Sequence, residues 1–398
     1  METSAPDPSA PSPPTVCLAL AGGNALGAYA AGAIETLEDA GVRFDVISGA
    51  SIGALTAAIV AGNPPGQAAR ALRAFWAQGS SGVAGAGSWP WMGSQAWQPM
   101  KLLAGLPEGL EPDTRREMRE MTSAAHALHA LLFGRPGLFR PAHAGLLTPW
   151  PGLRRPMALF DARPVVQTLE RLLDFDRLHS HGPQLIVSAV DLETGEPVYF
   201  DSRRERITPQ HLLASTALPP SFPPVEIDGR LLGDPGLWCN LPLDPVLQAG
   251  SGERLCFAVD LFSGSGARPH TFDGAMERAQ DVLFSAQSTR TVQAFRREQR
   301  LRHQLQQALQ RQPARAASDG LTEEPPGQVD LVLTAYRPPA HEIGAKTLEF
   351  SAASLGERWS AGQRDMAAAM AAHATGQAEI EDLGFRLYTA REEQKLAA

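Results

Sequence analysis

Ser51 is the residue of this sequence best placed to do chemistry, because it lies between Gly49 and Gly53 in a segment of the form G-x-S-x-G. The apolar run 45–48 before it predicts a short buried strand, and the helix formers of 54–61 predict a helix after it. A tight turn between such a strand and helix exposes the serine hydroxyl at a helix N-terminus, where developing negative charge is stabilised. The segment therefore predicts a nucleophile for acyl transfer.

A glycine-rich loop lies upstream of this serine. Gly22 and Gly23, with Asn24 after them, follow the apolar run 16–20 and precede a helical pattern that ends at Asp39. Such a loop presents backbone N–H groups to an anion, which is either the oxyanion of acyl transfer or a phosphate. No Lys-Ser/Thr pair follows the glycines, and their spacing departs from G-x-G-x-x-G, so neither a P-loop nor a dinucleotide site is favoured.

The third candidate is Asp234. An Asp228-Gly229 turn inside the run 225–232 predicts a hairpin, and Asp234 lies where its second strand ends. A carboxylate at this place is able to orient or deprotonate a serine. The alternative is that Asp-Pro-Gly is an ordinary turn without a chemical role.

These three features, in this order, resemble the patatin-like phospholipases, and most closely a bacterial branch of that family. The stretches 61–65 and 213–225, and 350–354 together with Trp359, fit the same family, so that the resemblance extends over about 15–370. It implies an α/β fold with three layers, α/β/α, to which the composition and periodicity of this chain add a lid-like insertion and a long helical C-terminal region. It also implies hydrolysis of acyl esters by a dyad of Ser51 and Asp234, with no histidine base.

In this family reading, Gly49 and Gly53 form the nucleophile elbow, and backbone N–H groups around Gly22, Gly23 and Asn24 bind the oxyanion. The sequence departs from the family pattern at two places. Asn24 replaces the third of three consecutive glycines, and asparagine tolerates a left-handed backbone better than other side chains do. Pro235 follows the aspartate where the family usually has glycine, and a proline that displaced the carboxylate would weaken catalysis.

Length and composition set the domain organisation. The 398 residues divide into a Pro/Ser/Ala-rich lead-in (1–14, expected to be disordered), a catalytic domain (15–262) and a helical extension with one further strand that completes the same domain (263–398). The stretch 79–156 is predicted to be a lid-like insertion, with Trp89, Trp91, Trp97 and Trp150 either meeting lipid or anchoring the segment. The net charge of −8 argues against nucleic acid as a partner.

Cysteine content and hydropathy indicate the compartment. Cys17, Cys239 and Cys256 lie in or beside apolar runs without metal-ligand spacing, which predicts free, buried thiols in a reducing compartment. The N-terminus lacks the pattern of a signal peptide, and no apolar run reaches about 18 residues. We expect a soluble, cytoplasmic protein with peripheral membrane contact allowed, and neither a metal nor an organic cofactor.

The remaining elements are predicted from periodicity. Helices are expected at 67–76, 117–133, 160–173, 209–215 and 272–311, the last polar over its second half, and buried strands at 184–190, 255–261 and 329–334. A hairpin turn at 194–196 leads into 197–200. The histidines that a conventional triad would draw on show no local signature and are interpreted as solvated or structurally paired: His270, His303, His341 and His373.

Two functions follow from these residues. The first is a serine hydrolase that cleaves a phospholipid, a neutral lipid or another acyl ester. The second is a catalytically weakened or inactive scaffold of the same fold that binds lipid or a granule or membrane surface, which Asn24 and Pro235 motivate.

Overall fold

The structure, a computed structural model, describes residues 13–80, 112–142, 157–249, 252–311 and 327–390. Within them, ten strands form one mixed sheet in the order β11-β12-β10-β9-β1-β2-β5-β8-β7, with β6 also paired to β5. Its centre is parallel: β1 (Thr15–Leu20), β2 (Val46–Gly49), β5 (Gln184–Asp191), β9 (Arg254–Asp260), β10 (Val329–Ala335) and β12 (Phe385–Thr389). The other four pair antiparallel: β6 (Pro197–Asp201), β7 (Val225–Ile227), β8 (Arg230–Gly233) and β11 (Ile380–Asp382).

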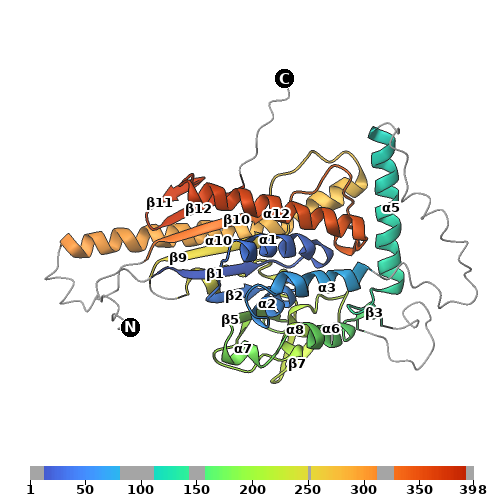
Figure 1. Cartoon of the computed structure of the whole chain (residues 1–398), viewed down its shortest axis with the longest axis horizontal. Helices are drawn as coiled ribbons and strands as arrows, with labels where there is room; N and C mark the ends of the chain where they lie inside the picture. Colours follow the sequence, from blue (N-terminus) through green and yellow to red (C-terminus); the bar gives the residue numbers. More distant parts are fainter. Residues whose placement is uncertain (1–12, 81–111, 143–156, 250–251, 312–326, 391–398) are drawn as a thin grey trace, which may run out of the picture.

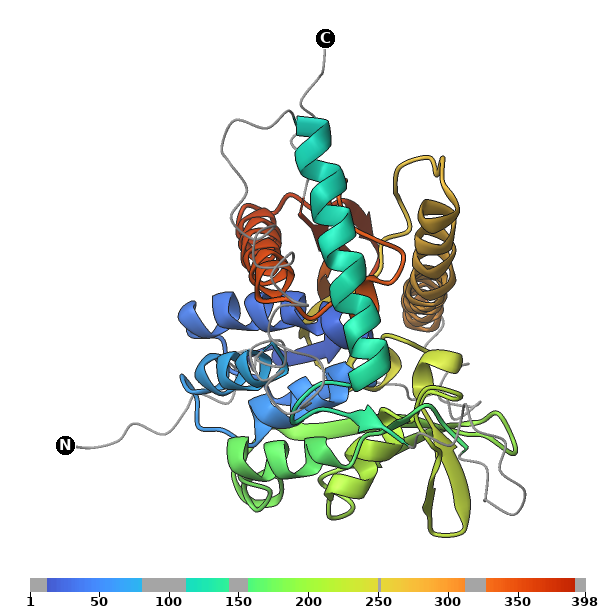
Figure 2. The same cartoon turned by 90° about the vertical axis from the view of Figure 1, so that its right-hand side faces the viewer.

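Helices cover both faces of this sheet, so that the chain has three α/β/α layers (Figure 2). One face carries α1 (Gly27–Asp39), α2 (Ile52–Ala61), α3 (Ala68–Ser80) and α12 (Ala352–Ala374), and the other carries α9 (Asp244–Leu247) and the long α10 (Phe272–Arg311). Helix α5 (Pro112–Phe133) stands across one end of the molecule (Figure 1). Short helices α6 (Pro164–Leu172), α7 (Arg177–Ser180) and α8 (Pro209–Ser215) lie near the β5 side of the sheet, and β3 (Arg140–Pro141) pairs with β4 (Phe160–Asp161).

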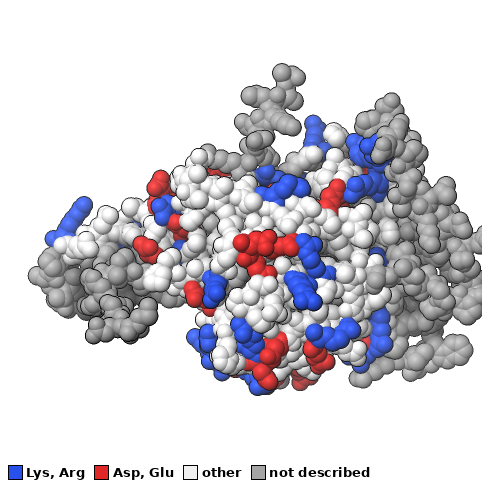
Figure 3. Space-filling view, viewed as in Figure 1, with Lys and Arg blue, Asp and Glu red and all other residues white. Residues whose placement is uncertain are grey.

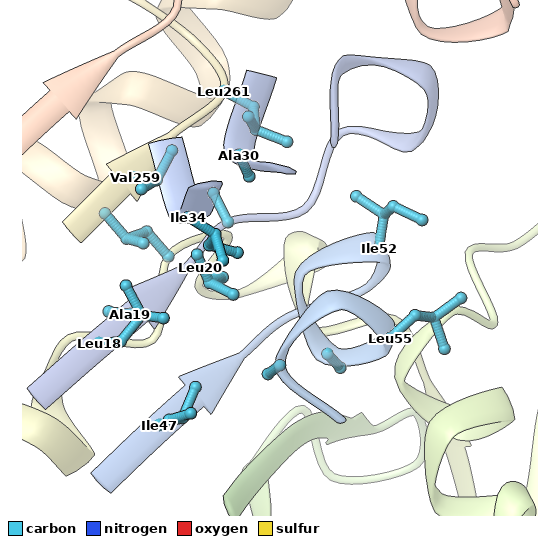
Figure 4. Packing of buried hydrophobic residues seen from close by; sticks show 14 of the residues in the cluster. Leu18, Ala19, Leu20, Ala30, Ile34, Ile47, Ile52, Leu55, Val259 and Leu261 are labelled. Carbon is cyan, nitrogen blue, oxygen red and sulfur yellow. The ribbon is translucent and has the colours of Figure 1, made fainter. Parts of the chain in front are cut away.

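The core lies where the parallel strands meet the helices on either side (Figure 4). Leu18, Leu20 and Ile47 are fully buried on β1 and β2, because a parallel sheet is covered on both faces. Helices α1 and α12 approach one another closely: a Cβ on Gly32 would lie 2.0 Å from the Trp359 carbonyl oxygen. Only glycine permits this contact.

The three layers of the α/β fold and most elements agree with the sequence predictions. Helix α1 ends at Asp39, β7 and β8 form the predicted hairpin, and α10 has the predicted bounds. The three cysteines are free and buried. On the face shown in Figure 3, positive and negative side chains are interspersed.

Two predictions about elements need correction. The helix predicted at 160–173 begins only at Pro164, because proline is favourable at the first position of a helix, and Phe160 lies in β4 instead. A single further strand was predicted after 262, whereas β10, β11 and β12 all join the sheet. Among the described helices, none is both long and apolar enough to cross a membrane.

Candidate active site

Ser51 occupies a strained turn at the carboxyl end of β2. Its backbone has φ 54° and ψ −126°, a region that L-residues rarely adopt, and α2 begins at the next residue. A Cβ on Gly49 would lie 2.4 Å from the Gly53 carbonyl oxygen, and a Cβ on Gly53 would lie 2.2 Å from the Leu20 carbonyl oxygen. The turn therefore requires glycine at both positions.

A buried serine from another helix forms a hydrogen bond with the backbone of this turn. The backbone N–H of Ser51 donates to Oγ of Ser215, at 3.0 Å, and Ser215 is the fully buried last residue of α8. Sequence reasoning included 213–225 only as part of the family resemblance. A serine at the end of a short helix carries no local mark of such a role.

Asp234 follows β8 and is held by backbone groups. Its N–H donates to the Ala217 carbonyl oxygen at 2.9 Å, and its Oδ1 accepts the Gly236 N–H at 2.8 Å. Its φ of −60° and ψ of 127° are extended, as a residue before proline prefers. Pro235 occupies the first turn of the short 3-10 helix η6 (Pro235–Leu237), where a missing N–H costs nothing. The proline therefore fits this turn.

The Asp234 carboxyl is 3% exposed, and this burial raises its pKa to about 6. Two groups act against the rise and favour the carboxylate: the side chain of Ser51 and the backbone N–H of Gly236. Ser51 and Asp234, which lie far apart in the sequence, line the same cavity.

The glycine loop lies beside the serine, and its N–H groups differ in availability. The N–H of Gly22 donates to the Asn240 carbonyl oxygen at 3.0 Å, so that this predicted oxyanion donor is already engaged. Gly22 is needed for space, since a Cβ there would lie 2.9 Å from Cβ of Ser51. No hydrogen bond within the described ranges occupies the N–H of Gly23 or Asn24, and both residues line the cavity. Asn24 adopts a left-handed φ of 51°.

Asn240 and Gln287 connect the glycine loop to the aspartate turn. Nδ2 of Asn240 donates to the Gly22 carbonyl oxygen at 3.0 Å. Oε1 of Gln287, on α10, accepts the Asn240 N–H at 2.7 Å, and its Nε2 donates to the Gly236 carbonyl oxygen at 3.2 Å. Neither residue was predicted from the sequence, because each acts through contacts between distant segments.

The cavity that these residues share has a volume of about 290 Å³ and is mostly apolar. Phe139, Phe160 and Phe222 form one wall, with ring centroids 4.9 to 5.6 Å apart. Ser51 and Asp234 are among its few polar lining residues. A mostly apolar cavity with a few polar groups matches a ligand that has an apolar chain and a polar group.

Comparison with known proteins identifies the family. The family model described as patatin-like phospholipase matches residues 18–247, more than half of the chain. The chain belongs to the patatin-like phospholipase family. A second model, described as patatin phospholipase, matches 282–381. A search of curated proteins found no match.

Solved structures similar to this patatin-like chain include VipD from Legionella pneumophila, at 14% identity and a TM-score of 0.34, over 88% of this chain and 68% of that one. The ExoU–SpcU complex from the type III secretion system of Pseudomonas aeruginosa matches at 20% identity and a TM-score of 0.29, over 63% of this chain and 44% of that chain. The match thus covers less than half of the length of that chain of the complex.

A buried ion pair lies next to one wall of the cavity. Thr347 and Leu348 line the cavity, and the adjacent Lys346 is fully buried. Its Nζ lies 2.6 Å from Oδ1 of Asp281 on α10. Since breaking a buried pair leaves an uncompensated charge, this contact fixes the segment against α10.

A second buried aspartate resembles Asp234 but lies outside the cavity lining. Asp260, the last residue of β9, is 3% exposed, and its Oδ1 accepts the Phe262 N–H at 3.2 Å. Burial raises its pKa to about 6, and the side chain of Ser288 on α10 acts against that rise.

Other predicted features of this patatin-like chain lie away from the cavity or outside the described residues. None of the four candidate histidines lines the cavity; His341 contacts Glu357 and His373 contacts Asp330. No group of three or more potential metal ligands occurs in the described ranges. The lead-in and most of the lid-like insertion, with Trp89, Trp91, Trp97 and Trp150, lie outside the described residues.

Proposed function

We propose that this protein is a serine hydrolase of lipid acyl esters in which Ser51 is the nucleophile and Asp234 is its base. The observation that carries the proposal is that both residues line one mostly apolar cavity, with Ser51 on a strained turn and within reach of the Asp234 carboxylate. A nucleophile, an adjacent base and a backbone that holds the base are the parts that covalent catalysis requires.

The reaction would proceed in two half-reactions. The Asp234 carboxylate accepts the proton of the Ser51 hydroxyl as Oγ attacks the ester carbonyl carbon. The tetrahedral oxyanion is bound by the N–H groups of Gly23 and Asn24, which are available in the structure. Asp234 then gives the proton to the leaving alkoxide, and an acyl-serine remains. Water attacks this ester, gives a proton to Asp234, and the fatty acid leaves as Ser51 recovers its proton.

The raised pKa of Asp234 suits this role. A carboxylate with a pKa of about 6 accepts a proton more readily than an exposed aspartate does, yet it is ionised at neutral pH. The binding-only alternative drew on Asn24 and Pro235. Asn24 adopts the left-handed conformation that the loop needs. With Pro235 in place, the Asp234 carboxylate still accepts a hydrogen bond from the Gly236 N–H. Both departures are therefore compatible with catalysis.

The test is labelling by a fluorophosphonate, together with hydrolysis of a short p-nitrophenyl ester. We expect Ser51→Ala to abolish labelling and to lower kcat/KM by about 10⁴-fold or more, since the nucleophile is lost. Ser288→Ala is the matched control, because Ser288 lies beside the other buried aspartate, and we expect it to be labelled and active. Labelling that persists in Ser51→Ala would refute the proposal.

A further inference from the structure

The C-terminal half of α5 exposes an apolar surface. Leu128 and Leu132 are 54% and 53% exposed, four residues apart and hence on one face of the helix. No Asp, Glu, Lys or Arg occurs from 121 to 133, whereas the preceding turns are rich in charge. Burial also lowers the pKa of His126 and His129, which keeps this half of the helix uncharged at neutral pH.

Two further elements expose apolar side chains. Leu237 and Trp238, directly after the aspartate turn, are 55% and 47% exposed. On α10, Met276 and Leu283 are 48% and 61% exposed. They flank Gln280 at spacings of four and three residues, and so lie on the same stripe of the helix as Gln280.

All three elements line the candidate active-site cavity. Leu131 of α5, Gly236 of the aspartate turn, and Gln280 with Phe284 of α10 belong to its lining. Helix α5 and the N-terminal part of α10 lie at the same end of the molecule, with α5 in front of the sheet in Figure 2 and α10 to its right. Each of the three elements therefore carries exposed apolar residues close in sequence to a residue that lines the cavity.

We propose that these six residues form a rim that inserts into the surface of a lipid bilayer and places the cavity against it: Leu128, Leu132, Leu237, Trp238, Met276 and Leu283. The inference rests on the proposed function, because an acyl chain bound for an apolar cavity has to leave a bilayer without crossing water. The rim continues into that cavity, which favours a bilayer over a protein as its occupant.

The experiment measures co-sedimentation with vesicles of phosphatidylcholine alone, at low and at raised salt, in the Ser51→Ala background so that turnover plays no part. We expect Leu128→Asp combined with Leu132→Asp to lower the vesicle-bound fraction by about tenfold or more, because aspartate is costly to bury in lipid. Raised salt should leave binding of the parent protein unchanged, since apolar insertion is not screened.

The control is the pair Leu301→Asp and Leu305→Asp. These leucines are also four residues apart and exposed, at 64% and 45%, but they lie on the half of α10 that extends away from α5 (Figure 1). We expect this variant to bind vesicles as its parent does. The proposal would be overturned if both variant pairs lost vesicle binding equally, or if the Leu128/Leu132 variant still bound vesicles.

A separate arm distinguishes failure of the rim from failure of the proposed function. With Ser51 restored, the Leu128/Leu132 variant should hydrolyse a soluble p-nitrophenyl ester within about twofold of wild type while losing hydrolysis of vesicle lipid. A lower melting temperature with unchanged vesicle binding would overturn the proposal, because it would show that other parts of the chain cover this face.

Discussion

Asp234 and Asp260 occupy similar places and have similar chemistry. Each lies at the end of a strand, is 3% exposed, and accepts the backbone N–H of the residue two positions later. Burial raises both pKa values to about 6, and each carboxyl has a serine side chain near it. Neither burial nor a shifted pKa therefore distinguishes the two.

The difference lies in the two serines and in the cavity. Ser51 precedes α2 on a strained turn and lines the cavity, whereas Ser288 lies inside α10 and is 4% exposed. Ser51 faces the cavity and has the glycine loop beside it, whereas Asp260 does not line the cavity. A perturbed pKa marks a candidate, and the surrounding geometry decides between function and structure.

The strongest test of this contrast replaces each carboxylate by its amide. We expect Asp234→Asn to lower kcat/KM by about 10³-fold, because an amide cannot accept the serine proton. Asp260→Asn should retain activity within about threefold, since Asp260 does not line the cavity. Hydrolysis of a soluble p-nitrophenyl ester by both variants measures the two effects. A loss in Asp260→Asn as large as that in Asp234→Asn would show that the two aspartates act together.

The pH dependence of the rate separates the two carboxyls further. If Asp234 is the base, kcat/KM falls about tenfold per pH unit below its pKa of about 6, where the carboxyl is protonated. Asp260→Asn should leave this profile unchanged. A profile without a transition between pH 5 and 7 would contradict the role of Asp234.

The pH dependence of the free energy of unfolding, in contrast, should contain about equal contributions from the Asp234 and Asp260 carboxyls. Each folded-state pKa lies above the unfolded value of about 3.9, so the native state binds more protons between these values. The contribution of these two carboxyls to the free energy of unfolding therefore falls as pH rises from about 4 to 6 and is then constant. Asp260→Asn should remove about half of this contribution, measured as the difference between variant and wild type in urea unfolding across that range.

The parts of the site that sequence could predict are those with a local pattern. Ser51, with its flanking glycines, is marked by a strand, a turn and a helix within a few residues, and Asp234 by a hairpin. The predicted sheet centre and long α10 also follow from local periodicity. Strand β11 was missed because it has only three residues, and β12 because Arg386 interrupts its apolar run.

Residues that act across distant segments were not predictable. Ser215 supports the turn that holds Ser51 from a helix more than 150 positions away in sequence, and Gln287 joins two loops from α10. The local sequence around a serine or glutamine contains no pattern that predicts such a role. The engaged N–H of Gly22 was equally invisible, since it depends on where the Asn240 carbonyl lies.

Gln287 tests whether the alignment of the glycine loop and the aspartate turn matters. We expect Gln287→Ala to lower kcat by about tenfold with little change in KM, because both loops lose a shared tether. Gln299→Ala is the control: Gln299 is also buried on α10, roughly 18 Å further along the axis. Steady-state kinetics on the soluble ester measure both. Equal losses in the two variants would indicate a general loss of helix stability instead.

Pro235→Gly should have the smallest effect, and it tests whether the proline constrains Asp234. The proline is compatible with the extended aspartate before it and with the first turn of η6. The carboxylate accepts its hydrogen bond from the N–H of Gly236, so it does not need an N–H at position 235. We therefore expect kcat/KM within about threefold of wild type, with the free energy of unfolding lowered by about 0.4–1 kcal/mol because glycine frees the unfolded chain. The soluble-ester assay and urea unfolding measure these. A gain in activity of tenfold or more would instead show that the proline holds the carboxylate away from Ser51, and Asp234 would then resemble Asp260 more closely than its position in the cavity implies.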